Sequence, residues 1–364
     1  MTIRPEHLAA LGDLGYNEQE ACFIYLVATH SGYFTLRQFL DYTRTAKGWT
    51  VHQFTTKSIH LGHVRAATYG RQTAVFNVFS RKIYGALDRD NLRNRRRLSS
   101  ELIHTRLLIL DFVLAHPSLE YLETENDKVT YFRDRLGIPE ALIPGRIYKG
   151  INPESTTKRS FVDRFPVFLS AESDRPDGQS VPTFIYCDPA GRSLLHYITH
   201  LRTYDPFLRR LPDFEFIYAA PSPVKFRRAE QFFRNLFDDN SPANSRSLNR
   251  YFRVRQLWAE NQHSLLTRAD RDLLRYGNQR YKGEIYESAY KEWIAHNAAE
   301  DIMFRLLPGP HQKALSSGFR THLLPRDYDI FADKSGSEHR TVSSAERSVS
   351  RSASRSEEER TKHF

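Results

Sequence analysis

Three capping-box motifs follow one another near the start of the chain and constrain its fold more than any other feature. In each motif an Asn or Thr side chain that can accept a hydrogen bond precedes a Glu or Gln by three residues. The three pairs are Asn17 with Glu20, Thr35 with Gln38, and Thr50 with Gln53. Apolar residues at helical spacing follow each pair, and Gly32 stands where the first helix would end. The pattern therefore predicts three short helices up to Leu61.

Two segments after the third predicted helix alternate between apolar and polar side chains, as β-strands do. They run from Val64 to Ala67 and from Thr73 to Phe79, around a tip of Tyr69, Gly70 and Arg71. Three helices followed by such a hairpin have the order of a winged helix-turn-helix. We therefore expect residues 1–117 to hold a winged helix together with a long helix that follows it.

The stretch from Tyr42 to Leu87 contains no Asp and no Glu. At the chain's average acidic content, 43 of 364, these 46 residues should hold about five acids. The basic residues within it are Arg44, Lys47, Lys57, Arg65, Arg71, Arg81 and Lys82. Seven basic residues are what the chain average predicts, so the signal is the absence of opposing charge. Such a surface favours a polyanionic partner, and an ordinary solvated surface is the alternative.

The outward side of the third predicted helix is polar and cationic. Such side chains can hydrogen-bond base edges or phosphates in a major groove. The residues on this side are Thr50, Gln53, Thr56, Lys57 and His60. The further cations expected to contact DNA are Arg71 at the hairpin tip and the block of Arg93, Arg95, Arg96 and Arg97. For any one of these residues, ordinary solvent exposure is the alternative interpretation.

Residues Asp88 to Ala115 are predicted to form one long helix. Asp88 and Asp90 suit its first turn, where carboxylates meet the positive end of the helix dipole. Its later part is apolar on nearly every side. Such a helix is either buried in a larger core or paired with a second copy of the chain, so a homodimer through residues 98–115 is one expectation.

The rest of the chain is divided by its composition and hydrophobic pattern. We expect a helical connector at 118–158, an α/β domain at 159–240, a helical region at 241–333 and a disordered tail at 334–364. Strands are predicted at Phe161–Leu169, Thr183–Cys187 and Phe214–Ala220, with helices at Ser193–Arg210 and Val224–Phe237. The overall fold class is therefore α+β.

The order of elements in the α/β domain resembles a degenerate PD-(D/E)XK nuclease core. Chemistry of that type needs an acid on one strand and an acid with a lysine on the next, so that the carboxylates hold Mg²⁺. Asp163 and Asp188 are the candidate catalytic acids, but the second strand offers no lysine. An ion pair for Asp163 and ordinary turn chemistry for Asp188 are the alternatives.

The sequence indicates no other chemistry. His196 and His200 are spaced as a ligand pair, but no third ligand completes a metal site. Cys22 and Cys187 form neither a disulfide framework nor a metal pattern, which indicates a reducing compartment. No segment approaches the ~18 consecutive apolar residues of a membrane span, so we expect a cytoplasmic protein with no membrane partner. The formal charge of +10 suits a polyanionic partner.

Two stretches resemble the replication-relaxation proteins of bacterial plasmids and other mobile elements. They are L-G-Y-N-E-Q-E-A-C-F-I-Y-L-V-A-T-H-S-G-Y-F from Leu14 to Phe34 and Y-L-E-T-E-N-D-K-V-T-Y-F from Tyr121 to Phe132. The element order from Phe161 to Phe237 is also similar. The resemblance implies an N-terminal winged helix, a degenerate nuclease fold and action on DNA. Where members of that group show E-x-D, this chain has Tyr186, Cys187 and Asp188, which weakens a nuclease assignment.

We therefore expect a DNA-binding winged-helix protein of a bacterial mobile element, acting in plasmid replication, transfer or their regulation. Its partner would be double-stranded DNA, and its second domain would be non-catalytic without a cofactor. One alternative is an Mg²⁺-dependent nuclease that uses Asp163 and Asp188. The other is a protein-interaction adaptor whose winged helix faces a protein partner.

Overall fold

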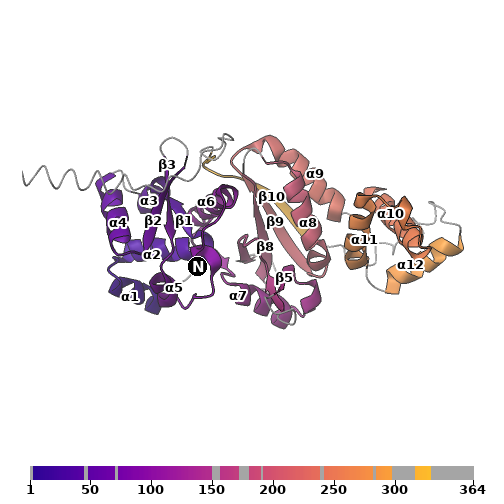
Figure 1. Cartoon of the computed structure of the whole chain (residues 1–364), viewed down its shortest axis with the longest axis horizontal. Coiled ribbons are helices and arrows are strands. Elements are labelled where there is room, and N and C mark those ends of the chain that lie inside the picture. Colours follow the sequence, from indigo (N-terminus) through magenta and orange to yellow (C-terminus); the bar gives the residue numbers. More distant parts are fainter. Residues whose placement is uncertain are drawn as a thin grey trace, which may run out of the picture. The chain divides into compact units, whose positions relative to one another are not determined.

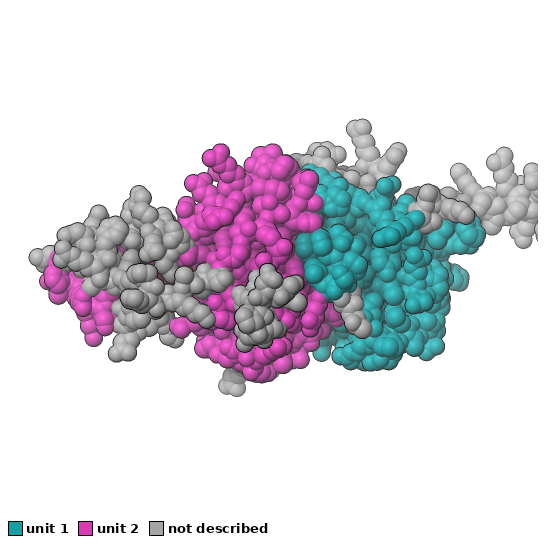
Figure 2. Space-filling model, turned by 180° about the vertical axis from the view of Figure 1, so that it is seen from behind, with its two compact units in different colours: residues 1–119, 189–191, 324–364 teal, residues 120–188, 192–323 magenta. Residues whose placement is uncertain are grey.

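A computed structural model shows a mixed α+β chain that divides into two units, unit 1 and unit 2 (Figures 1 and 2). The structure describes residues 3–44, 48–69, 73–149, 156–171, 180–189, 192–237, 242–281, 284–296 and 316–328. Unit 1 comprises residues 1–119, 189–191 and 324–364, and unit 2 comprises residues 120–188 and 192–323. Within the described ranges, no helix combines the length and apolar character needed to cross a membrane.

Unit 1 begins with a group of helices, two of which start at predicted capping boxes. Its helices are α1 (Pro5–Asp13), α2 (Glu18–Leu26), α3 (Leu36–Thr43), α4 (Gly48–His60), α5 (Arg81–Ala86) and α6 (Ser100–Ala115). Two predicted boxes are confirmed, because Asn17 and Thr35 each accept a hydrogen bond from the backbone of the third residue of their helix. The third box is wrong: α4 begins before Thr50. A cap contributes about 1 kcal/mol, less than the burial of Val51 and Phe54 that fixes this helix.

A three-stranded antiparallel sheet packs beside these helices. Its strands are β1 (Tyr33–Thr35), β2 (Val64–Tyr69) and β3 (Thr73–Val78), in the order β1-β3-β2. The predicted hairpin is confirmed as β2 and β3, whereas β1 was not anticipated. Phe34 of β1 stacks on Phe76 with ring centroids 5.2 Å apart, and Phe39 stacks on Phe54 at 4.1 Å. These rings join the sheet to α3 and α4, which lie beside it in Figure 1.

The predicted helix from Asp88 to Ala115 is wrong in its first half. After α5 the chain turns at Asp88, which has a positive φ, and forms a 3₁₀ turn at Arg93–Arg95 before α6 starts. The buried Asn94 amide donates hydrogen bonds to the carbonyls of Ala28 and Thr29, at 2.9 and 2.8 Å. These carbonyls belong to the π-helical turn Val27–Ser31 that follows α2. Tertiary hydrogen bonds therefore override the local helical pattern.

The second half of the predicted Asp88–Ala115 helix is confirmed as α6. Residues 103–113 of α6 are all buried in the folded chain, as expected for a helix within a larger core. The apolar surface that suggested a homodimer through residues 98–115 is therefore already covered, apart from the exposed Leu102. The homodimer stays a prediction that this surface no longer motivates.

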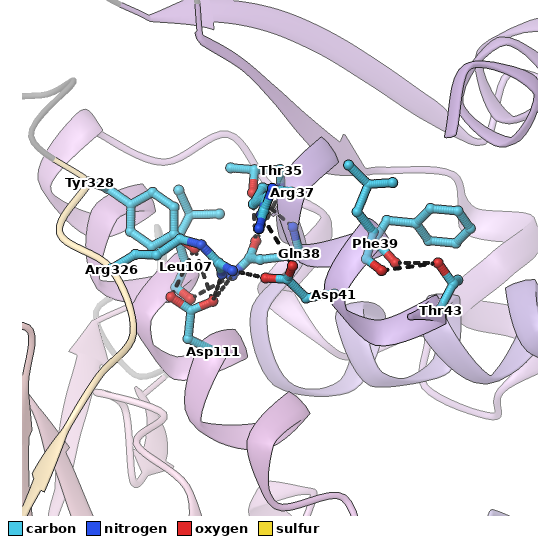
Figure 3. A network of polar contacts seen from close by, with 11 residues as sticks. Thr35, Arg37, Gln38, Phe39, Asp41, Thr43, Leu107, Asp111, Arg326 and Tyr328 are labelled. Carbon is cyan, nitrogen blue, oxygen red and sulfur yellow. Dashed lines mark hydrogen bonds and ion pairs between the residues drawn. The ribbon is translucent and has the colours of Figure 1, made fainter. Parts of the chain in front are cut away.

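After the residues of unit 2, the chain rejoins unit 1 at residue 324. A network of polar contacts binds the segment 324–328 to the rest of unit 1 (Figure 3). The buried Asp111 carboxylate of α6 accepts hydrogen bonds from Gln38 at 2.9 Å and from the Tyr328 hydroxyl at 2.8 Å. Arg326 reaches the same carboxylate at 3.1 Å and also pairs with Asp41 of α3. Burial raises the pKa of Asp111 to about 7, against the hydrogen bonds that lower it. The segment 324–328 is thus fastened to α3 and α6.

Unit 2 is built on a five-stranded mixed sheet. Its strands are β4 (Glu120–Tyr121), β7 (Val167–Ala171), β8 (Ser180–Cys187), β9 (Asp213–Ala220) and β10 (Ser316–Leu323), in the order β10-β9-β8-β7-β4. β8, β9 and β10 run parallel, and β7 and β4 are antiparallel to their neighbours. The helices α8 (Leu195–Leu208) and α9 (Phe226–Phe237) run alongside the strands and share their aromatic core (Figure 1).

The remaining elements of unit 2 lie before and after this α/β core. They are α7 (Glu125–Val129) with the π-helical turn Thr130–Arg135, 3₁₀ turns at Glu140–Leu142, Pro223–Lys225 and His263–Leu265, the hairpin β5 (Gly145–Lys149) and β6 (Thr156–Ser160), and helices α10 (Pro242–Ala259), α11 (Arg268–Arg280) and α12 (Glu284–Ala295). The sequence predicts that both tryptophans of this helical region are core residues. Trp293 is fully buried among these last helices, whereas Trp258 is 48% exposed. The strand β10 lies within 241–333, where a helical region is predicted, so that prediction is wrong for residues 316–323. The predicted tail at 334–364 falls outside the described residues.

Candidate nucleic-acid interface

Helix α4 separates a buried side from an outward side. The spacing of Val51, Phe54, Ser58 and Leu61 predicts a buried stripe. The first three are buried, whereas Leu61, which follows the end of α4, is 39% exposed. Gln53, Thr56 and His60 are exposed on the other side, and Thr50 is half-buried. Trp49 is 69% exposed and Ile59 is 44% exposed, so the outward side also carries apolar surface. The structure therefore brings three of the predicted polar residues together on one open face of α4, and adds an exposed indole that the prediction did not include.

Lys57 does not project freely from this face. Its ammonium group pairs with the Glu20 carboxylate, donates to the Gly15 carbonyl at 3.1 Å, and lies 5.3 Å from the centroid of the Tyr16 ring. Glu20 lies outside the acid-free stretch, 37 residues away in the sequence. This corrects the expectation that Lys57 offers an unopposed positive charge. The acid-free stretch gains its opposing charge from a neighbouring helix, which composition along the chain does not show.

The arginine block forms a turn and an extended segment. Arg93 and Arg95 are half-buried in the 3₁₀ turn, and Arg96 and Arg97 are exposed after it. The hydroxyl of Tyr33 donates to the carbonyl of Arg96 at 2.8 Å and accepts from the backbone of Leu98 at 3.1 Å. The backbone on both sides of Arg97 is therefore held by one side chain of β1. Arg71, the last predicted contact, lies outside the described residues.

Arg65 joins this surface, although it was not among the predicted contacts. The strand register places Tyr33, Asn77 and Arg65 in one row across β1, β3 and β2. Arg65 donates to the Asn77 side-chain oxygen through Nε at 3.0 Å and Nη2 at 2.7 Å, and its guanidinium lies 5.1 Å from the Phe79 ring centroid. Burial, followed by the nearby charge of Arg97, lowers the pKa of Arg65. The signal in the sequence that could have identified Arg65 as a contact is its position in the acid-free stretch Tyr42–Leu87.

In unit 2, Asp163 lies in a turn and not on the predicted strand. Phe161 and Arg164 both have positive φ values, which bend the chain before β7 begins. The Asp163 carboxylate lies 3.2 Å from His200 Nδ1 and accepts a hydrogen bond from the Tyr204 hydroxyl at 2.8 Å. Burial would raise the pKa of Asp163, but His200 and Tyr204 hold it below its usual value. The exposed His196 takes no part in this arrangement.

Asp188 lies at the carboxyl end of β8 and has its own partners. Lys225 Nζ lies 2.8 Å from the carboxylate and also donates to the Arg192 carbonyl at 2.6 Å. The Tyr218 hydroxyl of β9 donates to the same carboxylate oxygen as Lys225. The strand itself offers no lysine for this acid, because Lys225 comes from the turn before α9. Among the described residues, no group of three or more His, Cys, Asp or Glu is placed to hold a metal ion.

The two candidate catalytic acids, Asp163 and Asp188, therefore each contact a tyrosine hydroxyl and a basic side chain of the protein. In unit 1, by contrast, an open helix face and a pair of arginines lie beside a hairpin. Comparisons of the chain with protein families, with curated proteins and with solved structures give no match.

Proposed function

We propose that this protein binds double-stranded DNA through unit 1. In this proposal α2, α3 and α4, followed by the β2–β3 hairpin, act as a winged helix-turn-helix. The outward face of α4 enters the major groove, whose width admits an α-helix. The order β1-β3-β2 and the packing of α4 against the sheet support this interpretation.

The observation that carries the proposal is the composition of the open face of α4. Gln53 and Thr56 can hydrogen-bond base edges, and His60 extends the same face. Neither α4 nor the two hairpin strands contain an acidic residue. A phosphate backbone approaching this face therefore meets no carboxylate from these elements, and affinity can come from the cations beside it.

Unit 2 has a non-catalytic role in this proposal. Asp163 and Asp188 are bound by His200, Tyr204, Tyr218 and Lys225, so their contacts hold loops at one end of the sheet. The resemblance to replication-relaxation proteins motivates the further proposal that DNA binding serves the replication or transfer of a mobile element.

A protein-interaction adaptor is the second candidate function. It is favoured by the exposure of Trp49 and Ile59 on the same face of α4, because aromatic and aliphatic side chains are common anchors of protein interfaces. The DNA-binding experiment below distinguishes the two candidates.

The test is the affinity of the full chain for duplex DNA at several salt concentrations. Wild-type protein should bind, and its affinity should fall steeply as salt is raised. The double substitution Gln53→Glu and Thr56→Glu should weaken binding by at least about tenfold, because it sets two carboxylates against the phosphates. Gln231→Glu, on an exposed position of α9 in unit 2, makes the same type of change as a control. Absence of binding by wild-type protein, or equal binding by the double variant, would refute the proposal.

A further inference from the structure

Arg65 and the backbone around Arg97 are fixed by neighbouring residues of one cross-strand row, Asn77 and Tyr33. Burial, followed by the charge of Arg97, lowers the pKa of Arg65, in agreement with a row that links both residues through Tyr33 and Asn77. Among the described residues, neither guanidinium forms an ion pair with a carboxylate. Two like charges held near one another cost free energy, and that cost is removed when an anion binds to both.

The framework around the pair is organised by hydrogen bonds. Asn77 uses its side-chain oxygen to accept twice from Arg65 and its amide to donate to the Gly32 carbonyl at 2.8 Å. Tyr33 fixes the peptide groups on both sides of Arg97. Both framework residues are buried, and they are neighbours in the same cross-strand row. The Arg65 guanidinium is therefore positioned by the protein before any ligand arrives, which reduces the entropy lost on binding.

We propose that Arg65 and Arg97 together bind one phosphate group of the nucleic-acid backbone. Guanidinium groups match the geometry of phosphate oxygens and offer several donors in a fixed plane. We name Arg65, Arg97, Tyr33 and Asn77 the phosphate seat. This inference rests on the proposed function, and it adds the chemical group that the hairpin side of the interface binds.

Arg97→Gln tests the phosphate seat through two readouts of opposite sign. In chloride buffer the free protein should become more stable, with a melting temperature higher by roughly 1–2 °C, because the like-charge repulsion is removed. The affinity for every duplex should nevertheless fall by about fivefold to tenfold, because one phosphate contact is lost. If Arg97 had only a structural role, Arg97→Gln would lower the melting temperature instead.

Inorganic phosphate separates the seat from the proposed function. At equal ionic strength, phosphate should raise the melting temperature of wild-type protein more than chloride does, and Arg97→Gln should lose that difference. The control is Arg234→Gln in unit 2, an exposed arginine paired with Glu230, which should keep the wild-type response. Phosphate stabilisation that depends on Arg97 without any DNA binding would support the seat and refute the proposed function. DNA binding that Arg97→Gln leaves unchanged, or a lowered melting temperature for this variant, would overturn the seat.

Discussion

The buried carboxylates of unit 2 have partners within the protein, whereas Arg65 and Arg97 of unit 1 form no ion pair with an acid among the described residues. In unit 2, Asp188 is matched by Lys225, and Asp205 is matched by Arg209 and Arg280. In unit 1, Arg65 is held instead by the neutral amide of Asn77. A charge that is neutralised inside the fold contributes to its stability. A charge that is positioned but not neutralised remains available for a ligand.

The largest effect expected from this comparison is the loss of Asp205. Its fully buried carboxylate accepts from Arg209 at 2.8 Å and from the Tyr276 hydroxyl at 2.8 Å, and so ties α11 to α8. Asp205→Ala would leave the buried Arg280 without its acid and should lower the free energy of unfolding by about 3–5 kcal/mol. Urea denaturation measures this change. Glu230→Gln, which removes an exposed pair on α9, should cost about 0.5 kcal/mol or less. Equal effects of the two variants would contradict the account.

The next effect is a pH dependence of stability that comes from Asp111, a buried acid of unit 1. Burial raises its pKa to about 7 from the 3.8 expected in an unfolded chain. Because the folded state holds this proton more tightly, the associated stability is fully present below pH 3.8 and is lost as the pH rises to about 7. The free energy of unfolding should therefore fall by up to about 1.4 kcal/mol per pH unit in that window. Asp111→Asn should remove this slope. A difference between wild type and variant that grows in favour of wild type with rising pH would contradict the prediction.

The smallest effect concerns Lys57. Unlike Arg65 and Arg97, this cation of unit 1 forms an ion pair with an acid of the protein, Glu20. Lys57→Met should lower the free energy of unfolding by about 1 kcal/mol, because the mostly buried Glu20 loses its partner. It should leave the salt dependence of DNA affinity unchanged, since this charge is already neutralised. Binding titrations at several salt concentrations measure that dependence. If Lys57→Met reduced the salt dependence of DNA affinity, Lys57 would have to be a DNA-contacting residue, contrary to this prediction.

Local signals in the sequence predicted the parts of the fold that local interactions determine. The capping boxes at Asn17 and Thr35 form as their spacing indicates, because each box bonds residues three positions apart. The alternation in β2 and β3 likewise predicted the hairpin. Trp293 reached the core as expected, but Trp258 did not, because an aromatic side chain alone does not determine which face of a helix is covered.

The contacts that sequence reasoning missed join residues far apart in the chain. Lys57 meets Glu20, Asp188 meets Lys225, and Asn94 bends the chain away from the predicted long helix by bonding carbonyls of the π-helical turn. The outward face of α4 could be predicted because it follows from helical period. The position of Arg65 beside Arg97 depends on the strand register and on the Tyr33 hydroxyl, and neither can be read from spacing.

The measurement that tests the central claim most directly is the slope of log affinity against log salt for duplex DNA. Each phosphate contact contributes about 0.9 to the magnitude of that slope. Wild-type protein should bind with a steep slope, and the double substitution Arg65→Gln and Arg97→Gln should lower its magnitude by about one, because the two arginines share one phosphate. Arg234→Gln should leave it unchanged. Identical slopes for wild-type protein and the double variant would contradict the claim that Arg65 and Arg97 bind a polyphosphate.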